Sequence, residues 1–218
     1  MKLITHVQEA TKVQHTDTSN MVHAIDRIGE TPVDILKRGV VHFNLWRHAN
    51  GLRELDMRGA DLKGLDLKEA NLTQVDLCGA NLKDTDLRYA SLYRANLEGA
   101  DLLRADLTHA ELGKAILRNA YLVRTTMIDC NLWDADITGA CFDNAWIISS
   151  NLGKVRGAGA SFIEANLERT MFILSDLEGA DFRNSRLVKA DLGHTNLKGA
   201  RFEGAVLTGA RLPDRFQM

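Results

Sequence analysis

Residues 55–104 read LDMRG ADLKG LDLKE ANLTQ VDLCG ANLKD TDLRY ASLYR ANLEG ADLLR, and this period of five continues to Leu212. Each repeat has a large apolar residue at its centre, from Met57 to Leu212, and 22 of the 32 centres are Leu. Two positions before the centre stands Ala, Ser, Thr or Cys in 28 of the 32 repeats. Because five matches neither the 3.6-residue period of a helix nor the two-residue period of a strand, the chain is expected to turn after every repeat.

The two apolar positions of each repeat, one large and one small, are predicted to point inward. Four repeats then close one coil of about 20 residues, and the small residue fits where the sides converge on a narrow interior. Consecutive coils would pair through their backbones at about 4.8 Å, so that eight coils form a rod of about 35–40 Å.

Two columns of residues spaced by 20 support this coil length. One is a predicted stack of four rings on one face, formed by Phe142, Phe162, Phe182 and Phe202. The other holds Gly two positions after the centre, with Asn119 in the one remaining place, at positions 59, 79, 99, 139, 159, 179 and 199. Gly and Asn tolerate positive φ best, so one corner of each coil is predicted to be a type II turn.

The centre at Gly157 lacks a side chain and is the one defect in the pattern. Either Val155, which stands in the preceding small position, fills the space, or a local cavity or kink lies there.

The A(D/N)LXX pattern of these repeats resembles that of the pentapeptide repeat proteins. The resemblance covers about three quarters of the chain, from residue 55 onward, in one uninterrupted register. It implies an all-β solenoid, a right-handed quadrilateral β-helix of about eight four-sided coils. Square shape and handedness come from the resemblance, since the period alone indicates only a coil with regular turns. The segment GVVHFNLWR, residues 39–47, resembles a G-V-x-x-W-N-x-W-R lead-in to such repeats, with Phe43 in place of Trp.

The ends of a solenoid expose unpaired edges that need covers. Residues 31–51 predict an N-terminal α-helical cap, with Thr31 as N-cap, Pro32 as first helical residue and Gly51 as its end. Its apolar stripe, expected to lie over the first coil, consists of Leu36, Val40 and Phe43, flanked by Ile35 and Trp46.

The chain therefore divides into four parts. Residues 1–30 form an N-terminal tail without a clear pattern, 31–51 the capping helix, 52–214 the β-helix and 215–218 a C-terminal tail. Pro213 would stop the ladder of coils, and Phe216 is placed to plug the end.

Charge and composition restrict the classes of function. The 27 basic and 29 acidic residues give a net charge of −2, which does not favour a nucleic-acid binder. The start of the chain lacks a signal-peptide pattern, and no apolar run approaches the roughly 20 residues of a membrane span. Three cysteines, an odd and sparse set, favour a reducing compartment. A soluble, cytoplasmic, bacterial protein is expected, without direct contact to nucleic acid or membrane.

No catalytic constellation is found. The seven histidines form no metal-ligand spacing with a cysteine, and neither a phosphate-binding loop nor a nucleophile elbow is present. The expectation is no enzyme, no cofactor and no metal. Cys130 stands in a small inward position, whereas Cys78 and Cys141 point outward. A column of carboxylates with basic neighbours indicates a charge-paired face rather than a phosphate mimic; it consists of Asp66, Asp86 and Asp106.

Outward positions become apolar in the middle of the repeats. This region is predicted to bind a protein, and the partner is either another protein or a second copy of the chain; isolated apolar residues on a surface are the alternative interpretation. The candidate partner-binding residues are Tyr121, Val123, Ile128, Trp133, Trp146, Ile148, Ile163, Met171 and Ile173.

Three functions compete at this point. The first is a non-enzymatic interaction scaffold or regulator that uses the apolar region. The second is a DNA mimic that binds gyrase, as in the quinolone-resistance members of the family. That resemblance implies an acidic rod with protruding loops and a C-terminal helix, and this sequence departs from it in all three respects. The third, an enzyme or ligand carrier, has only Gly157 as a hint of a cavity.

Overall fold

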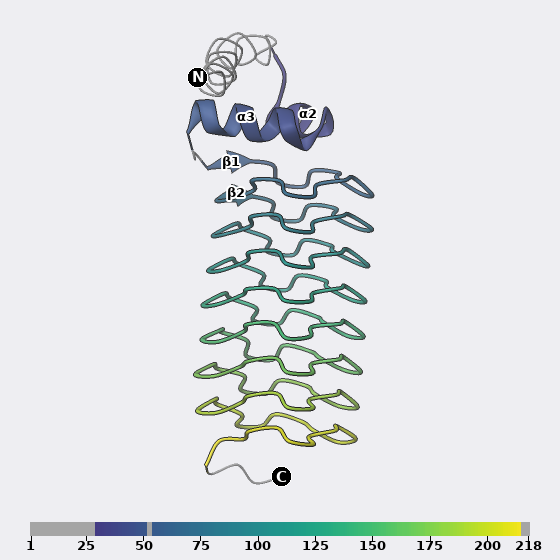
Figure 1. Cartoon of the computed structure of the whole chain (residues 1–218), viewed down its shortest axis with the longest axis vertical. Helices are drawn as coiled ribbons and strands as arrows, with labels where there is room; N and C mark the ends of the chain where they lie inside the picture. The colour runs from purple at the N-terminus through teal and green to yellow at the C-terminus, as the bar shows by residue number, and fades with distance from the viewer. Residues whose placement is uncertain (1–28, 52–53, 215–218) are drawn as a thin grey trace, which may run out of the picture.

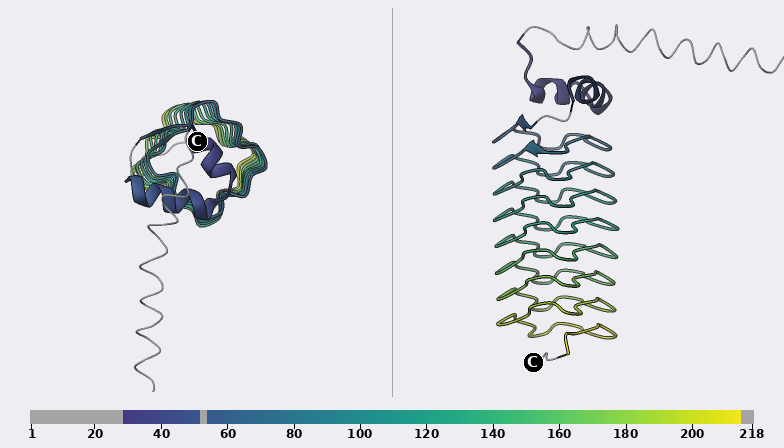
Figure 2. Two further views of the ribbon diagram at one scale, coloured as in Figure 1. Left: turned by 90° about the horizontal axis from the view of Figure 1, so that it is seen from above. Right: turned by 90° about the vertical axis from the view of Figure 1, so that its left-hand side faces the viewer.

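The computed structural model describes residues 29–51 and 54–214. They form a rod of stacked coils with two helices across its N-terminal end (Figure 1). Seen along the rod, the coils superpose on a four-sided outline (Figure 2). The predictions for residues 1–28 and for Phe216 lie outside the described residues.

The backbone register confirms the coil of 20 residues. Strands β1 (Leu55–Asp56) and β2 (Val75–Asp76) pair in parallel, with Leu55 opposite Val75. From Asp61 to Asp191, every fifth residue forms a single parallel bridge to the residue 20 positions later. Each side of a coil therefore contributes one paired residue before the chain turns.

Positive φ at the predicted corner of each coil is confirmed, from Gly59 through Asn119 to Gly199, and the other three corners have it as well. All positions at five-residue intervals from 59 to 209 have positive φ, so every corner is left-handed, and most of them are not glycine. Leu174, at φ 59°, and Tyr89, also at φ 59°, are examples. Such a conformation costs an L-residue roughly 1–2 kcal/mol, which the hydrogen bonds between coils must offset. Glycine marks one corner in the sequence, but the turn geometry requires the same conformation at all four.

The interior consists of stacked columns, as expected. Phe142, Phe162, Phe182 and Phe202 lie in parallel stacks with centroids 4.9–5.0 Å apart. Phe172 comes from the opposite side of the coil and meets Phe162 edge-on, at 5.7 Å and 80°. Edge-to-face and offset-stacked rings are both favourable arrangements, so the aromatic cluster ties two opposite sides of the rod together.

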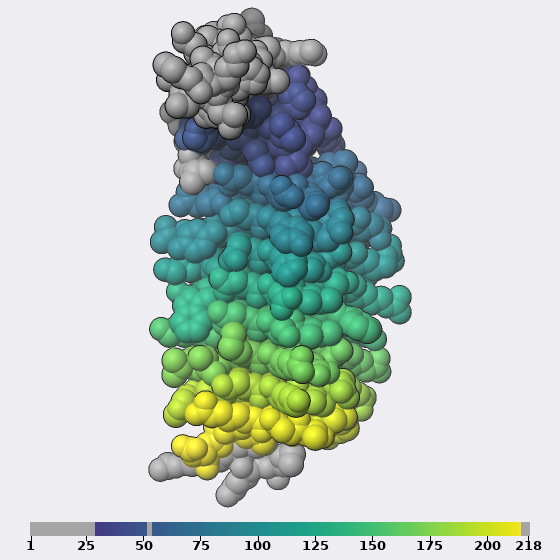
Figure 3. Space-filling model, viewed as in Figure 1, coloured from purple at the N-terminus to yellow at the C-terminus, as the bar shows by residue number. Residues whose placement is uncertain are grey.

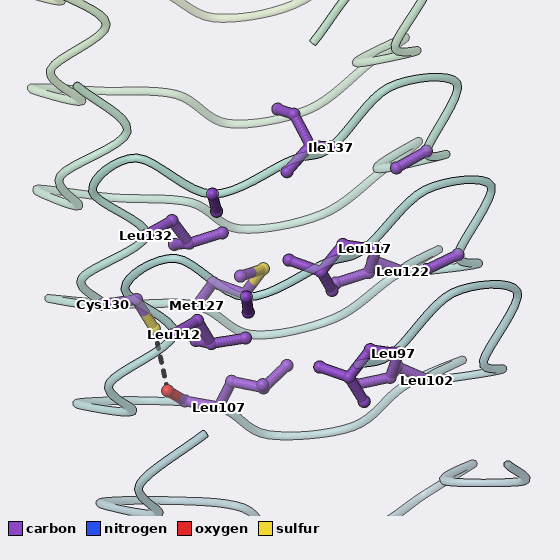
Figure 4. Close-up of a cluster of buried hydrophobic side chains, with 14 of the residues drawn as sticks. Leu97, Leu102, Leu107, Leu112, Leu117, Leu122, Met127, Cys130, Leu132 and Ile137 are labelled. Carbon is purple, nitrogen blue, oxygen red and sulfur yellow. Dashed lines mark hydrogen bonds between the residues drawn. The ribbon is translucent and has the colours of Figure 1, made fainter. Parts of the chain in front are cut away.

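The polar residues in small inward positions hydrogen-bond to the backbone. Ser150 donates to the carbonyl of Met127 at 2.7 Å, and Thr125 donates to that of Leu122 at 2.8 Å. Figure 4 shows the thiol of Cys130 donating to the carbonyl of Leu107 among the leucine columns. Burial raises the pKa of Cys130 to about 12, so this thiol stays protonated at neutral pH. The placement of Cys130 in the core is confirmed.

The space at Gly157 is closed. A Cβ there would lie 2.8 Å from Leu177 Cδ2 and 2.9 Å from Ile137 Cγ1, so the residues one coil below and above fill it. Val155 is buried, but it is not among the nearest neighbours of the missing side chain. Ile137 and Leu177 therefore fill the space most closely, and the alternative of a local cavity is wrong.

The predicted single capping helix is two helices, α2 (Pro32–Lys37) and α3 (Val40–Asn50). Gly39 separates the two helices, because its φ of 128° is not helical. Residues with a side chain rarely adopt this conformation, so a glycine is favoured at the break. Thr31 is the N-cap of α2, with a complete capping box to Asp34, as the sequence indicated.

Helix α3 covers one edge of the first coil with polar side chains. The amide of Asn44 donates to the carbonyl of Glu69 at 2.9 Å and accepts from the N–H of Asn71 at 2.8 Å. Arg47 is fully buried and donates to the carbonyl of Thr73. These two side chains replace the backbone of a preceding coil, while Phe43 packs on the core.

We expect Asn44→Ala to lower the free energy of unfolding by about 1–3 kcal/mol, because the N–H of Asn71 would lose its acceptor. Urea denaturation measures this loss, and hydrogen exchange at Asn71 should accelerate. Asn50→Ala is the matched control, since Asn50 only donates to Trp46 at the helix end. Equal stability of the two variants would contradict the capping role of Asn44.

Gly157→Ala should also destabilise the protein, by about 1–3 kcal/mol, because the added methyl group collides with Ile137 and Leu177. Shortening Leu177 to Ala should relieve part of that cost, so the double variant should be more stable than the sum of the single losses. Additive losses in thermal denaturation would show that the site has free space.

Candidate protein-binding face

Four faces run along the rod, each with one outward column before and one after the central residues. The Trp146 face is the one whose outward columns contain Trp146 and Ile148. The first column includes residues 66, 86, 106, 126, 146, 166, 186 and 206, as the bridges between coils show. The second lies two residues further along the chain in every coil.

Three of the nine predicted residues meet on the Trp146 face. Trp146 is 56% exposed and pairs with Thr126 and Asn166 in the neighbouring coils. Ile128 and Ile148 are half-buried and occupy consecutive places in the second column. Ile128, Trp146 and Ile148 form one apolar group, here called the Trp146 cluster.

Three further predicted residues lie on the preceding face. Tyr121 is 57% exposed in its first column. Val123 and Ile163 share the second column but are separated by Asp143, which accepts hydrogen bonds from the Ser161 hydroxyl and the Ile163 N–H. A carboxylate thus interrupts the apolar surface on this face.

The last three lie on the following face, and one of them has an internal role. The ring of Trp133 lies against Gly153, where any Cβ would collide with it, and Lys154 Nζ is 5.0 Å from the ring centroid. Met171 is 41% exposed, and Ile173 is half-buried. This face and that of Tyr121 are on opposite sides of the rod, so the nine predicted residues are distributed over three faces, with the Trp146 face between the other two.

Charged residues on the Trp146 face follow an order that the search for apolar residues missed. Asp106 precedes the Trp146 cluster along the rod, and Asp129 lies beside its first member, Ile128. Arg169, Arg186 and Lys189 follow the cluster, together with the acidic Glu168. Asp129 and Arg169 occupy the same corner column, one coil above and one coil below Ser149. Grouping the charged residues of the sequence at intervals of 20 positions, the length of one coil, would have revealed this order.

The predicted pairing of the acidic column is confirmed for two of its members. Arg88 lies 2.5 Å from Asp86 and 3.8 Å from Asp106. The hydrogen bond from Arg88 holds the pKa of Asp86 below its usual range. On the other side of the cluster, Arg186 lies 3.3 Å from Glu168. Asp129, Arg169 and Lys189 form no ion pair within the described residues.

Among residues 29–51 and 54–214, no group of His, Cys, Asp and Glu is arranged to hold a metal ion. None of the described helices is long and apolar enough to cross a membrane. Side chains of successive coils pack into a continuous ridged surface on the face shown in Figure 3.

Several solved structures are similar to this chain. HetL, a pentapeptide repeat protein involved in heterocyst differentiation regulation in the cyanobacterium Nostoc, is 25% identical over 80% of this chain and 98% of its own, with a TM-score of 0.36. QnrB1, a plasmid-mediated fluoroquinolone resistance protein, is 20% identical over 70% and 76%, with a TM-score of 0.35. Rfr23 from the cyanobacterium Cyanothece is 23% identical over 78% and 97%, with a TM-score of 0.22. A search of curated proteins found no match.

The family model for pentapeptide repeats matches eight copies, over residues 52–84, 66–102, 85–122, 105–144, 115–153, 158–187 and 185–214. These matches cover nearly the whole solenoid and imply a right-handed β-helix. The chain belongs to the pentapeptide repeat family.

Proposed function

We propose that this protein is a non-enzymatic interaction module that binds a protein partner through the Trp146 face. The observation that carries the proposal is the Trp146 cluster, an apolar group on a flat face with a tryptophan 56% exposed. Covering such a group removes apolar area from water, at about 25 cal/mol per Å². Aromatic residues at the centre of a polar surrounding are the usual energetic centre of an interface.

The hydrogen bonds that hold the coil at Trp146 come from its backbone. Trp146 holds its coil through backbone bonds alone, donating to Thr125 at 2.9 Å and accepting from Met127 at 2.7 Å. Asp106 and Arg186 occupy equivalent positions in the same column. Any residue can make these backbone bonds, so the hydrogen bonds between coils do not require a tryptophan here, and the exposed part of the ring is available to a partner.

The rigid rod favours binding through such a face. Its outward side chains project from a backbone that is bonded to the coils on both sides, so little conformational entropy is lost when a partner docks. The three cysteines are unpaired, which supports a reducing compartment, and we propose the cytoplasm.

The DNA-mimic alternative requires a long acidic surface, and the charges of this chain do not supply it. Arg88 neutralises Asp86, Lys83 lies 2.8 Å from Asp101, and the net charge is −2. The likeness to QnrB1 is limited to the repeat, so gyrase binding is not proposed.

A photo-crosslinking amino acid at position 146 tests the proposed face in cells that naturally contain the protein. We expect irradiation to join the protein to a discrete protein partner, giving one shifted band, because position 146 would lie at the centre of the interface. The same amino acid at position 121 is the matched control, since Tyr121 is as exposed but lies on another face.

Adding Ile148→Asp to the position-146 probe should abolish the cross-linked band by placing a charge within the cluster. Thermal denaturation would verify that this variant keeps its fold. Cross-links from position 121 but not from 146 would assign partner binding to the face of Tyr121. A cross-linked band that is unchanged by Ile148→Asp would show that the Trp146 cluster is not the centre of the interface.

A further inference from the structure

We propose that the Trp146 face binds a second copy of this chain, with the two rods antiparallel. This inference rests on the proposed function, because it names the partner of the same face. The argument comes from the order of charges along that face, which is complementary to its own reverse.

The corner column beside the cluster shows this complementarity most clearly. It contains Asp129, Ser149 and Arg169 in consecutive coils, and all three corners are left-handed with φ of 53–57°. Asp129 and Arg169 are exposed. A reversed copy centred on the level of Ser149 would therefore place Asp129 of each chain opposite Arg169 of the other.

The first outward column also has an acidic and a basic residue at equal separations from a central residue, here two coils on each side of Trp146. Asp106 lies two coils before Trp146, and Arg186 lies two coils after it. The side chain of Asp106 is 40% exposed and that of Arg186 52% exposed. In the same reversed arrangement Asp106 would meet Arg186, while Trp146 would meet Trp146 of the second copy.

A two-fold axis lying in the interface across the rods produces all of these contacts together. The axis makes the contact isologous, so each charge pair occurs twice, on the two sides of the apolar centre. An axis along the rods would instead set every coil against the same coil of the partner. Asp106 would then face the coil of the second copy that contains Asp106 itself, and it would not meet Arg186. The charges therefore favour the antiparallel arrangement.

The remaining positions within these coils add no further ion pair, since Lys189 would face His109 and Thr126 would face Asn166. Ile148 meets Ile148 beside the tryptophans, which extends the apolar centre. Ile128 faces Glu168, whose carboxylate is already 3.3 Å from Arg186 of its own chain. An apolar centre within a charged rim is the ordinary composition of a specific interface.

The contact spans five coils, or about 20 Å along the rod. An interface of this length is at the small end of the range for stable complexes, so a dissociation constant in the micromolar range, about 1–100 µM, is expected. Analytical ultracentrifugation of the full chain across that concentration range measures it.

Two charge-reversed variants test the orientation. The basic variant carries Asp106→Arg and Asp129→Arg, and the acidic variant carries Arg169→Asp and Arg186→Asp. Each alone opposes like charges at every rim position, so we expect self-association to weaken by at least about tenfold. An equimolar mixture restores every pair across the axis, and we expect a heterodimer with affinity close to that of the unmodified protein.

Matched controls separate specific pairing from total charge. Glu98→Arg with Glu178→Arg adds the same charge on the face opposite to Trp146, and it should leave self-association unchanged. All four reversed positions lie on the surface, and heterodimer formation itself would show that both variants are folded.

The results distinguish this inference from the proposed function. A monomer at all concentrations, or variants that associate normally or fail to pair in the mixture, would overturn the antiparallel dimer. A cross-link from position 146 to a different protein would, in that case, still support the proposed function. The absence of any cross-link from position 146 together with a monomer would overturn both.

Discussion

In each repeat up to the one centred on Leu187, the N–H of the central residue donates to a carbonyl 19 positions later, as Leu97 does to Ile116 at 2.6 Å. The N–H two residues further on does the same, from Gly99 to Arg118 at 2.9 Å. These bonds fix a register of 20 residues per coil, and a slip by one residue would turn the leucine columns out of the core. Every other feature of the rod, from the stacked phenylalanines to the left-handed corners, depends on this register.

The hydrogen bonds that fix this register are made by the backbone, so they do not restrict the side chains of the outward columns. Because Asp106, Trp146 and Arg186 make equivalent backbone bonds, the order of their side chains is independent of the fold. Acidic, apolar and basic residues can therefore follow one another along a face without any change in the coil. The order of side chains along a face of such a rod can therefore determine which partner binds. When acidic residues lie toward one end and basic residues toward the other, a second copy in the reversed direction is the simplest complementary partner.

The sequence predicted the features that repeat, because the narrow interior imposes them on every coil. The coil length, the phenylalanine stack and the buried Cys130 belong to this class. Features used once were missed. Gly39 divides the cap, Asn44 replaces a missing coil, and Leu177 reaches into the space at Gly157; each depends on a neighbour that no period reveals. The left-handed corners were underestimated, since the hydrogen bonds between coils hold non-glycine residues there.

Trp133 and Trp146 show why exposure of a column does not by itself identify a binding residue. Both occupy outward positions in the middle of the rod, and by residue type and position in the repeat they cannot be distinguished. Gly153 leaves room for the ring of Trp133, and Lys154 lies 5.0 Å from that ring, so Trp133 is used within its own chain. Trp146 has Thr126 and Asn166 as its column neighbours and remains 56% exposed. The exposed part of its apolar surface has no cover within the described residues, and a partner that covers it would gain the free energy of removing that surface from water.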